Sequence, residues 1–180
     1  MRMTTSDEGL AQAAGDGDRD AFAALLARHY DRLFAFTFRL TGTRADAEDL
    51  TQDICLALPK KLRGFRGDAR FTTWLYRVAV NAAHDRRRRA ASHTRAAEGW
   101  GDWEVSRRAG DADTQEATEW LTQALSSLKP DLRDTAVLIL AEELTQGDAA
   151  QVLGLSEGTI AWRMSEVKKH LRARAAEDMS

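Results

Sequence analysis

Aromatic and basic residues gather in one stretch of the sequence, between residues 65 and 95. Aromatic faces can stack on unpaired bases and guanidinium groups can bind phosphates, so this combination suits opened, single-stranded nucleic acid. The same pattern also fits an amphipathic helix whose rings pack in a core and whose basic end is solvated. The residues concerned are Phe65, Phe71, Trp74 and Tyr76, followed by the four consecutive arginines Arg86 to Arg89.

The charge of this stretch differs from that of the whole chain. The 180 residues carry a formal net charge of -2, but Lys60 to Arg95 hold eleven Lys and Arg against two acids, a local charge of +9. From Glu98 to Glu119 seven acids stand against two arginines, a local charge of -5. Attraction to phosphate depends on the local field, so the net charge does not exclude a nucleic-acid partner.

Residue types that support metal or enzymatic chemistry are sparse. Cys55 is the only cysteine, which excludes an intrachain disulfide and a multi-cysteine zinc site. The four histidines have no metal-ligand spacing, no glycine-rich phosphate loop follows a strand pattern, and no catalytic pair of acids stands out. We therefore expect no metal, no cofactor and no enzymatic activity.

Composition indicates a globular protein of one or two small domains, with 43% hydrophobic and 30% charged residues. No run of about 18 apolar residues occurs, so we expect no membrane insertion. The first residues include Asp7 and Glu8 and no apolar run, which argues against a secretory signal. A cytoplasmic location fits these features and the single cysteine.

Helical periodicity dominates, and almost no strand-like alternation interrupts it, so we expect an all-α protein. In the first part of the chain we expect one helix from Asp20 to Leu40, ended by Thr41-Gly42. A second begins near Thr43 and buries Ala47, Leu50, Ile54 and Leu58 on one stripe, with Cys55 packing on its apolar side.

Pro59 should end or kink that second helix, because its ring clashes with the carbonyl four residues earlier. Gly64 and Gly67 bracket a short loop. Asp68 is the expected cap of a third helix that runs through the arginines, in which at least one of the adjacent Trp74 and Leu75 must be core. Three helices would form one domain.

A stretch rich in acids, Gly, Ser and Thr then predicts a flexible linker. It contains Trp100 and Trp103, which would dock on a partner or on this protein's own surface. Periodicity resumes at Trp120, and Pro130 suits the first position of a further helix.

The last segment has helix-turn-helix spacing. A short helix from Thr145 to Leu153 precedes Gly154, where a positive φ is expected, and Ser156 then caps a longer helix that ends in basic residues. Many helical hairpins share this spacing, so DNA binding is one interpretation of it.

Several sequence motifs occur in a particular order in both parts of the chain. They are residues 46–53 (Asp-Ala-Glu-Asp-Leu-Thr-Gln-Asp), 65–77 (Phe-Arg-Gly-Asp-Ala-Arg-Phe-Thr-Thr-Trp-Leu-Tyr-Arg), Asn81, 85–88 (Asp-Arg-Arg-Arg) and 158–160 (Gly-Thr-Ile) with Arg163. Together they resemble the short extracytoplasmic-function sigma factors of bacterial RNA polymerase, group 4 of the sigma-70 family. The resemblance covers about residues 18 to 95 and 116 to 175.

The resemblance implies two helical domains, with sigma region 2 in residues 1–95, an acidic linker in 96–115 and sigma region 4 in 116–180. It also implies that the second helix grips the clamp helices of the polymerase largest subunit. Asp49, Gln52 and Asp53 lie about one turn apart there and offer acceptors to basic partner side chains. Asp46 and Glu48 fit better as ordinary first-turn partners of the helix dipole.

For the promoter -10 element, the resemblance implies that the loop from Gly64 to Ala69 receives a flipped base and that the following helix lies against the separated strand. Asn81 would read a base edge or bond the backbone, and the arginine run would neutralise phosphate of the upstream duplex. The residues expected to bind -10 DNA are Phe65, Arg66, Arg70, Phe71, Trp74, Arg77, Asn81, Arg86, Arg87 and Arg88.

For the -35 element, the resemblance implies that the last helix enters the major groove. The expected contacts are Ser156, Thr159, Ala161, Trp162, Arg163, Ser165, Glu166 and Lys169. The sequence departs from the family pattern, with Ala161 and Glu166 at positions that commonly carry Lys or Arg and Trp162 at a common serine. We therefore expect an atypical -35 sequence or a stronger reliance on the -10 element.

The resulting hypothesis is a sigma factor that binds core polymerase, recognises the -10 and -35 elements and melts promoter DNA. Its expected partners are the clamp helices and flap of core polymerase, promoter DNA in duplex and single-stranded form, and an anti-sigma factor. The first alternative is a helix-turn-helix regulator that binds duplex DNA without polymerase. The second is a protein whose helices only dock another protein, which would need neither the arginine run nor the Gly-Thr-Ile helix.

Overall fold

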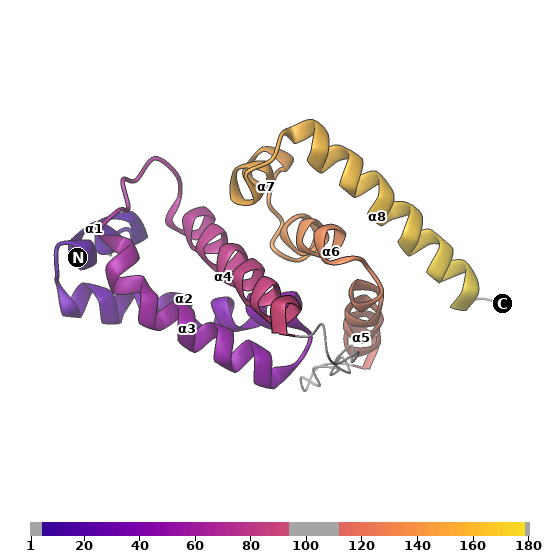
Figure 1. Cartoon of the computed structure of the whole chain (residues 1–180), viewed down its shortest axis with the longest axis horizontal. Coiled ribbons are helices and arrows are strands. Elements are labelled where there is room, and N and C mark those ends of the chain that lie inside the picture. The colour runs from indigo at the N-terminus through magenta and orange to yellow at the C-terminus, as the bar shows by residue number, and fades with distance from the viewer. Residues whose placement is uncertain (1–4, 94–111, 179–180) are drawn as a thin grey trace.

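The computed structural model describes residues 5–93 and 112–178, and all regular structure in these ranges is helical (Figure 1). This confirms the all-α prediction. Trp100 and Trp103, for which we expect docking on a partner or on this protein's own surface, lie outside the described residues. The elements are α1 (Asp7–Gly15), α2 (Arg19–Thr41), α3 (Arg44–Leu62), α4 (Phe71–His93), α5 (Ala112–Ser126), α6 (Pro130–Ala136), the π-helix η1 (Val137–Ala141), α7 (Gln146–Leu153) and α8 (Glu157–Asp178).

Local signals place most helix ends as predicted. Thr43 accepts a hydrogen bond from the Asp46 amide at the start of α3, and Gly42 ends α2 in the left-handed region with φ of 83°. Pro130 is the first residue of α6. These are short-range effects of side-chain caps, a proline without an N–H and a residue without a Cβ.

Two features of the first part of the chain differ from the sequence expectations. The sequence analysis contains no counterpart of α1, although Ser6 caps this helix and Asp7 and Glu8 lie in its first turn. Of the two effects expected of Pro59, the end of the helix is wrong, because α3 continues to Leu62, and a kink stays a prediction. The three residues after the proline stay helical because its missing N–H removes only one bond of the final turns.

The N-terminus of α4 is capped from a distant part of the chain. The Phe71 amide donates to Glu8 Oε1 at 3.0 Å, across 63 residues of sequence, and the helix begins at Phe71 after the Asp68 that we expected to cap it. Accepting this bond lowers the pKa of the Glu8 carboxyl below its ordinary 4.5. The bond thus ties α1 to α4.

Acid should therefore loosen the attachment of α1. A group whose pKa is lower in the folded state contributes stability above its unfolded pKa and loses it as pH falls through the folded value. We expect the urea midpoint of unfolding to fall as the pH drops below about 4.5, partly because Glu8 becomes protonated. In Glu8→Gln this dependence of the midpoint on pH should be weaker. Unfolding midpoints from pH 3 to pH 7 test this, and parallel curves for the two proteins would contradict it.

The core of the N-terminal half lies between α2, α3 and α4. Phe36, Leu50, Ile54, Phe71 and Val80 are almost fully buried there. A hydroxyl pair between Thr37 and Thr51, 2.7 Å apart, joins α2 to α3 inside this core. Cys55 packs at the edge of the core, and burial raises the pKa of its thiol, so it behaves as a packing residue.

A close approach of α1 to the end of α3 depends on Gly15. A Cβ at this position would lie 2.5 Å from the backbone oxygen of Leu62. Gly15→Ala should therefore force the two helices apart and destabilise the chain by about 1–3 kcal/mol. Urea unfolding checks this, with Gly64→Ala as control, because its Cβ would meet its nearest neighbour at an ordinary 3.5 Å. Equal midpoints for the two variants would contradict the prediction.

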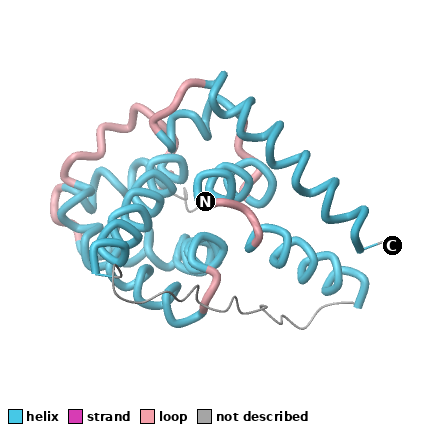
Figure 2. Tube along the Cα trace, turned by 45° about the vertical axis from the view of Figure 1, so that its right-hand side comes forward, coloured by secondary structure: helices cyan, strands magenta, loops and turns pink. Residues whose placement is uncertain are grey.

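The C-terminal half packs α6, α7 and α8 around Leu138, Val152, Ile160 and Val167, all at most 1% exposed. Gly154 ends α7 with φ of 66°, and the Ser156 hydroxyl accepts from the Thr159 amide at the start of α8. Both features match the helix-turn-helix prediction. The two views agree that this half lies against the N-terminal half (Figures 1 and 2).

None of the helices in the described ranges has the length and apolarity to cross a lipid bilayer.

Candidate nucleic-acid interface

The aromatic residues of the basic stretch form a cluster of rings at the start of α4. The centroid of Phe71 lies 6.0 Å from that of Phe65 and 5.8 Å from that of Trp74. Phe65 is 8% exposed and Phe71 1% exposed, whereas Trp74 is half-buried. Two of the three rings therefore pack in the core, and only Trp74 keeps surface on which a base can stack. A nucleic-acid role for Phe65 and Phe71 stays a prediction, one that their burial disfavours.

An exposed polar stripe runs along α4 beside this cluster. Arg70, at its entrance, and Arg77 and Asn81 within it are exposed and share one face with Trp74, at spacings of 4, 3 and 4 residues. The stripe extends for about 16 Å along the helix axis. Arg66 is also exposed, in the preceding loop. Leu75 is 3% exposed, in agreement with the expectation that one of the Trp74–Leu75 pair is core.

Three residues of the arginine run, Arg86, Arg87 and Arg88, pair with carboxylates. Arg86 lies 3.2 Å from an oxygen of Asp46, 3.2 Å from one of Asp49 and 3.8 Å from one of Asp53. Partial burial acts to lower the pKa of Arg86, but the hydrogen bonds to Asp46 and Asp49 outweigh it and raise the pKa. Arg88, which is 78% exposed, pairs with Asp85 one turn earlier.

A second surface lies on α3 and consists of Asp49, Gln52, Asp53 and Leu56, which we call the docking face. Asp49 and Asp53 side chains are each 65% exposed, and Gln52 is exposed. Leu56 is 82% exposed, and sequence reasoning missed it. The exposure of Leu56 could have been predicted from the helical pattern. Positions 49, 52, 53 and 56 share one helix face, and the buried stripe consists of 47, 50, 54 and 58 and does not include Leu56.

The predicted recognition helix, α8, presents most of its expected contacts. Ser156, Ala161, Trp162, Ser165 and Lys169 are exposed, with Trp162 at 62%. Thr159 and Glu166 are half-buried. The exposed Trp162 offers an apolar contact at a position where the family pattern has a serine.

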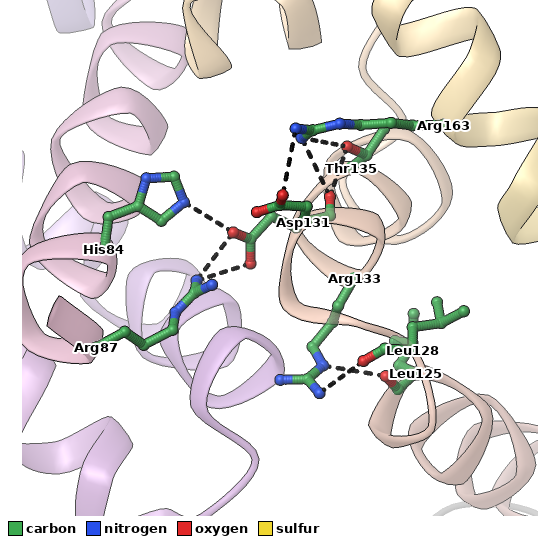
Figure 3. A network of polar contacts seen from close by, with 9 residues as sticks. His84, Arg87, Leu125, Leu128, Asp131, Arg133, Thr135 and Arg163 are labelled. Carbon is green, nitrogen blue, oxygen red and sulfur yellow. Dashed lines mark hydrogen bonds and ion pairs between the residues drawn. The ribbon is translucent and has the colours of Figure 1, made fainter. Parts of the chain in front are cut away.

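Arg163 instead turns inward (Figure 3). Its guanidinium lies 3.6 Å from Asp131 Oδ2 and donates to the Asp131 carbonyl and to the Thr135 hydroxyl at 3.3 and 3.5 Å. These contacts join α8 to α6. A role in DNA binding would have to compete with them.

Arg133 is a structural residue that the sequence analysis did not single out. It is 6% exposed, and its guanidinium donates to the carbonyls of Leu125 and Leu128 (Figure 3) and to that of Ser126. Burial lowers its pKa. The side chain thus supplies donors to carbonyls at and just after the end of α5.

No group of three or more potential metal ligands occurs among residues 5–93 and 112–178. Three surfaces stand out on the described residues: a basic stripe with an aromatic residue on α4, an acidic face with an exposed leucine on α3, and a helix-turn-helix in α7 and α8.

Comparison with known proteins matches both halves. The family model for Sigma-70 region 2 matches residues 25–93, and the model for Sigma-70, region 4, matches residues 118–171. An ECF RNA polymerase sigma factor, SigM of Mycobacterium tuberculosis, is 33% identical over 171 residues, covering 94% of this chain and 85% of SigM. The RNA polymerase sigma-H factor of Pseudomonas aeruginosa is 31% identical, covering 99% of this chain and 95% of its own length.

Two solved structures have the same fold. CnrH in complex with the cytosolic domain of CnrY gives a TM-score of 0.70 at 27% identity, covering 96% of this chain and 98% of CnrH. The sigma factor RpoE in complex with the anti-sigma factor NepR from Bartonella quintana gives a TM-score of 0.72 at 26% identity, covering 84% of this chain and 94% of RpoE.

Proposed function

The chain belongs to the sigma-70 family as an extracytoplasmic-function RNA polymerase sigma factor, and we propose which of its surfaces does what during transcription initiation. Residues 1–95 act as region 2, which binds core polymerase and opens the -10 element. Residues 116–180 act as region 4, which binds the -35 element. Residues 96–115 link them. No catalytic group, metal or cofactor takes part.

The docking face on α3 binds the clamp helices of the largest polymerase subunit. The support is its composition: exposed acceptors at Asp49, Gln52 and Asp53 lie on one helix face with an apolar side chain, Leu56, that is 82% exposed. An exposed apolar residue beside polar acceptors is a candidate contact of a protein interface.

The stripe on α4 binds the separated -10 strand. Arg70, Arg77 and Asn81 contact phosphates and base edges, and Trp74 stacks on a base. The loop before α4 receives a flipped base next to Arg66. Base capture offsets an unstacking cost of a few kcal/mol per step, so melting needs no ATP.

Helix α8 enters the major groove of the -35 element through Ser156, Ala161, Trp162, Ser165 and Lys169. Lys169 is the single exposed cation among these side chains, so phosphate attraction is weak. The -35 sequence should therefore be atypical, and binding assays on -35 variants test this. Equal affinity for an ordinary family -35 sequence and for every other one would contradict it.

The observation that carries the proposal is the coexistence of the exposed docking face and the α4 stripe on one domain. A helix-turn-helix regulator that works without polymerase has no use for either surface. The relatives CnrH and RpoE were solved with protein partners, and NepR is an anti-sigma factor. By analogy we propose that an anti-sigma factor controls this chain and that it works in the cytoplasm.

In vitro transcription from a genomic library tests the function. Core polymerase is assayed with and without the full chain, and start sites are mapped. We expect new start sites that share upstream motifs only when both are present. A folded chain that adds no start site, or that binds duplex promoters equally well without polymerase, would contradict the proposal.

A further inference from the structure

Two carboxylates of region 4 are buried against region 2. The Asp134 side chain, on α6, is 1% exposed, and the Glu142 side chain, just after η1, is 3% exposed. The hydrogen bonds and ion pairs that join these two carboxylates to Arg32, Arg39, Tyr76, His84 and Arg87 all reach them from α2 or α4. Region 4 therefore gains these partners for its buried charges by closing onto region 2.

Asp134 faces the basic end of α4. His84 Nε2 lies 2.9 Å from Asp134 Oδ2, and Arg87 Nη2 donates to both Asp134 oxygens at 2.9 Å. Figure 3 shows His84 and Arg87 pointing from α4 toward α6. The carboxylate binds a guanidinium of the arginine run, which the family resemblance assigns to phosphate of the upstream duplex.

Glu142 makes a second set of contacts, with two partners on α2 and one on α4. It accepts from Arg39 Nη1 at 2.8 Å and from the Tyr76 hydroxyl at 2.5 Å, and Arg32 Nε lies 3.8 Å away. Burial and this acceptor raise the pKa of Tyr76 above its ordinary range, so the phenol stays a donor. Together with Asp134, Glu142 fixes region 4 to α4 at two points.

The backbone between the two carboxylates is irregular in a way that serves this contact. In a regular α-helix, residues eight apart are about 80° apart around the axis. The π-helix η1 separates Asp134 from Glu142 and has more residues per turn, so it brings them back toward one face. Glu143 follows with φ of 56°, an uncommon value for a residue with a Cβ. Such departures concentrate at functional positions.

Polar contacts and apolar packing both hold this junction, since buried apolar residues of the two halves belong to one core cluster. A pocket of about 270 Å³ that is partly open to solvent lies beside it, lined among others by Arg86, Arg87, Pro130 and Arg133. The desolvation cost of a buried ion pair cancels much of its Coulomb attraction, so its net contribution to stability is small. Contacts of this kind can therefore hold the two regions together and still be released.

We propose that Asp134 and Glu142 form a latch that holds region 4 over α4 in the free chain and keeps Arg87 from nucleic acid until region 4 is drawn away. Asp134 takes the place of a phosphate on Arg87, and Glu142 holds the closed arrangement through Arg39 and Tyr76. This rests on the proposed function of α4 as the DNA-binding helix. Separation of the two regions, as on a polymerase that engages each at a different promoter element, would release it.

Isosteric substitutions test the latch in the full chain. Asp134→Asn with Glu142→Gln removes both charges and keeps their shapes. We expect a larger radius of gyration by small-angle X-ray scattering. We also expect at least about fivefold tighter binding of a fluorescent 20-base-pair duplex DNA by the free protein, because opening frees Arg87 for phosphate and a closed majority lowers apparent affinity by its population. Asp131→Asn is the matched control, an exposed α6 carboxylate that pairs within region 4.

The outcomes separate the latch from the proposed function. Unchanged radius and unchanged affinity would overturn the latch, and so would opening without a gain in DNA affinity. Asp134→Lys with Glu142→Lys places like charges opposite each other and serves as a reference for the open state. A wild-type radius of gyration equal to that of this variant would also overturn the latch. Circular dichroism melting confirms that each variant is folded. The scattering result needs no DNA, and promoter-directed transcription by the wild-type chain tests the function by itself.

Discussion

A chain that carries Asp49→Arg and Leu56→Asp is expected to lose association with core RNA polymerase by at least about 100-fold. The first change places a cation where the proposed partner surface is basic, and the second places a charge at the exposed apolar residue of the docking face. Truncation or reversal of a central contact residue is typically worth about 2–4 kcal/mol in an interface, so two such changes suffice.

The fold should survive these changes. Leu56 is 82% exposed, so a polar residue there leaves no cavity. Asp49 is 65% exposed and meets Arg86 at 3.2 Å, and an exposed pair of this kind contributes only about 0–1 kcal/mol. Thermal unfolding should therefore change by a few degrees at most.

Co-elution with core polymerase and biolayer interferometry measure the association. Glu48→Arg is the matched control, because it makes the same charge change on α3 outside the docking face. Its side chain is 49% exposed and pairs with Arg44. Wild-type association of the double variant, or an equal loss with Glu48→Arg, would show that α3 docks through another face. Gln52→Ala added to Asp49→Arg provides a second test of the same face.

Features decided within a few residues could be predicted from the sequence. The caps at Thr43 and Ser156, the left-handed Gly42 and Gly154 and the start of α6 at Pro130 all depend on one side chain or one dihedral angle. Helical periodicity likewise gave the buried stripe of α3. These effects act over one turn, so no knowledge of the tertiary structure is needed.

Contacts between distant residues could not be predicted. Glu8 caps α4 across 63 positions, and Asp134 meets Arg87 across 47. A sequence contains many acids and many arginines, and only the packing of helices selects which of them meet. The same holds for the aromatic residues: the pattern at 65, 71 and 74 fits both a core and a stacking surface, because both need rings on one side of a helix.

The largest effect on stability is expected at Phe71. Its ring is 1% exposed and contacts the rings of His29, Phe65 and Trp74. Phe71→Ala should lower the free energy of unfolding by about 3–5 kcal/mol, the usual cost of removing a buried phenyl group. Domains of this size have about 5–15 kcal/mol in total, so much of region 2 would unfold near 37 °C. Urea denaturation monitored by circular dichroism measures the loss.

Two leucine substitutions then separate core packing from base stacking. If Phe71 is a core residue, Phe71→Leu keeps most of its apolar volume, and the folded variant should bind single-stranded -10 DNA within about twofold of wild type. Trp74→Leu removes the half-exposed ring and should weaken the same binding about tenfold, since stacking of one base is worth about 1–3 kcal/mol. The reverse pattern, with strong loss at Phe71 and none at Trp74, would mean that the buried ring turns outward on DNA and that the closed cluster is a property of the free chain alone.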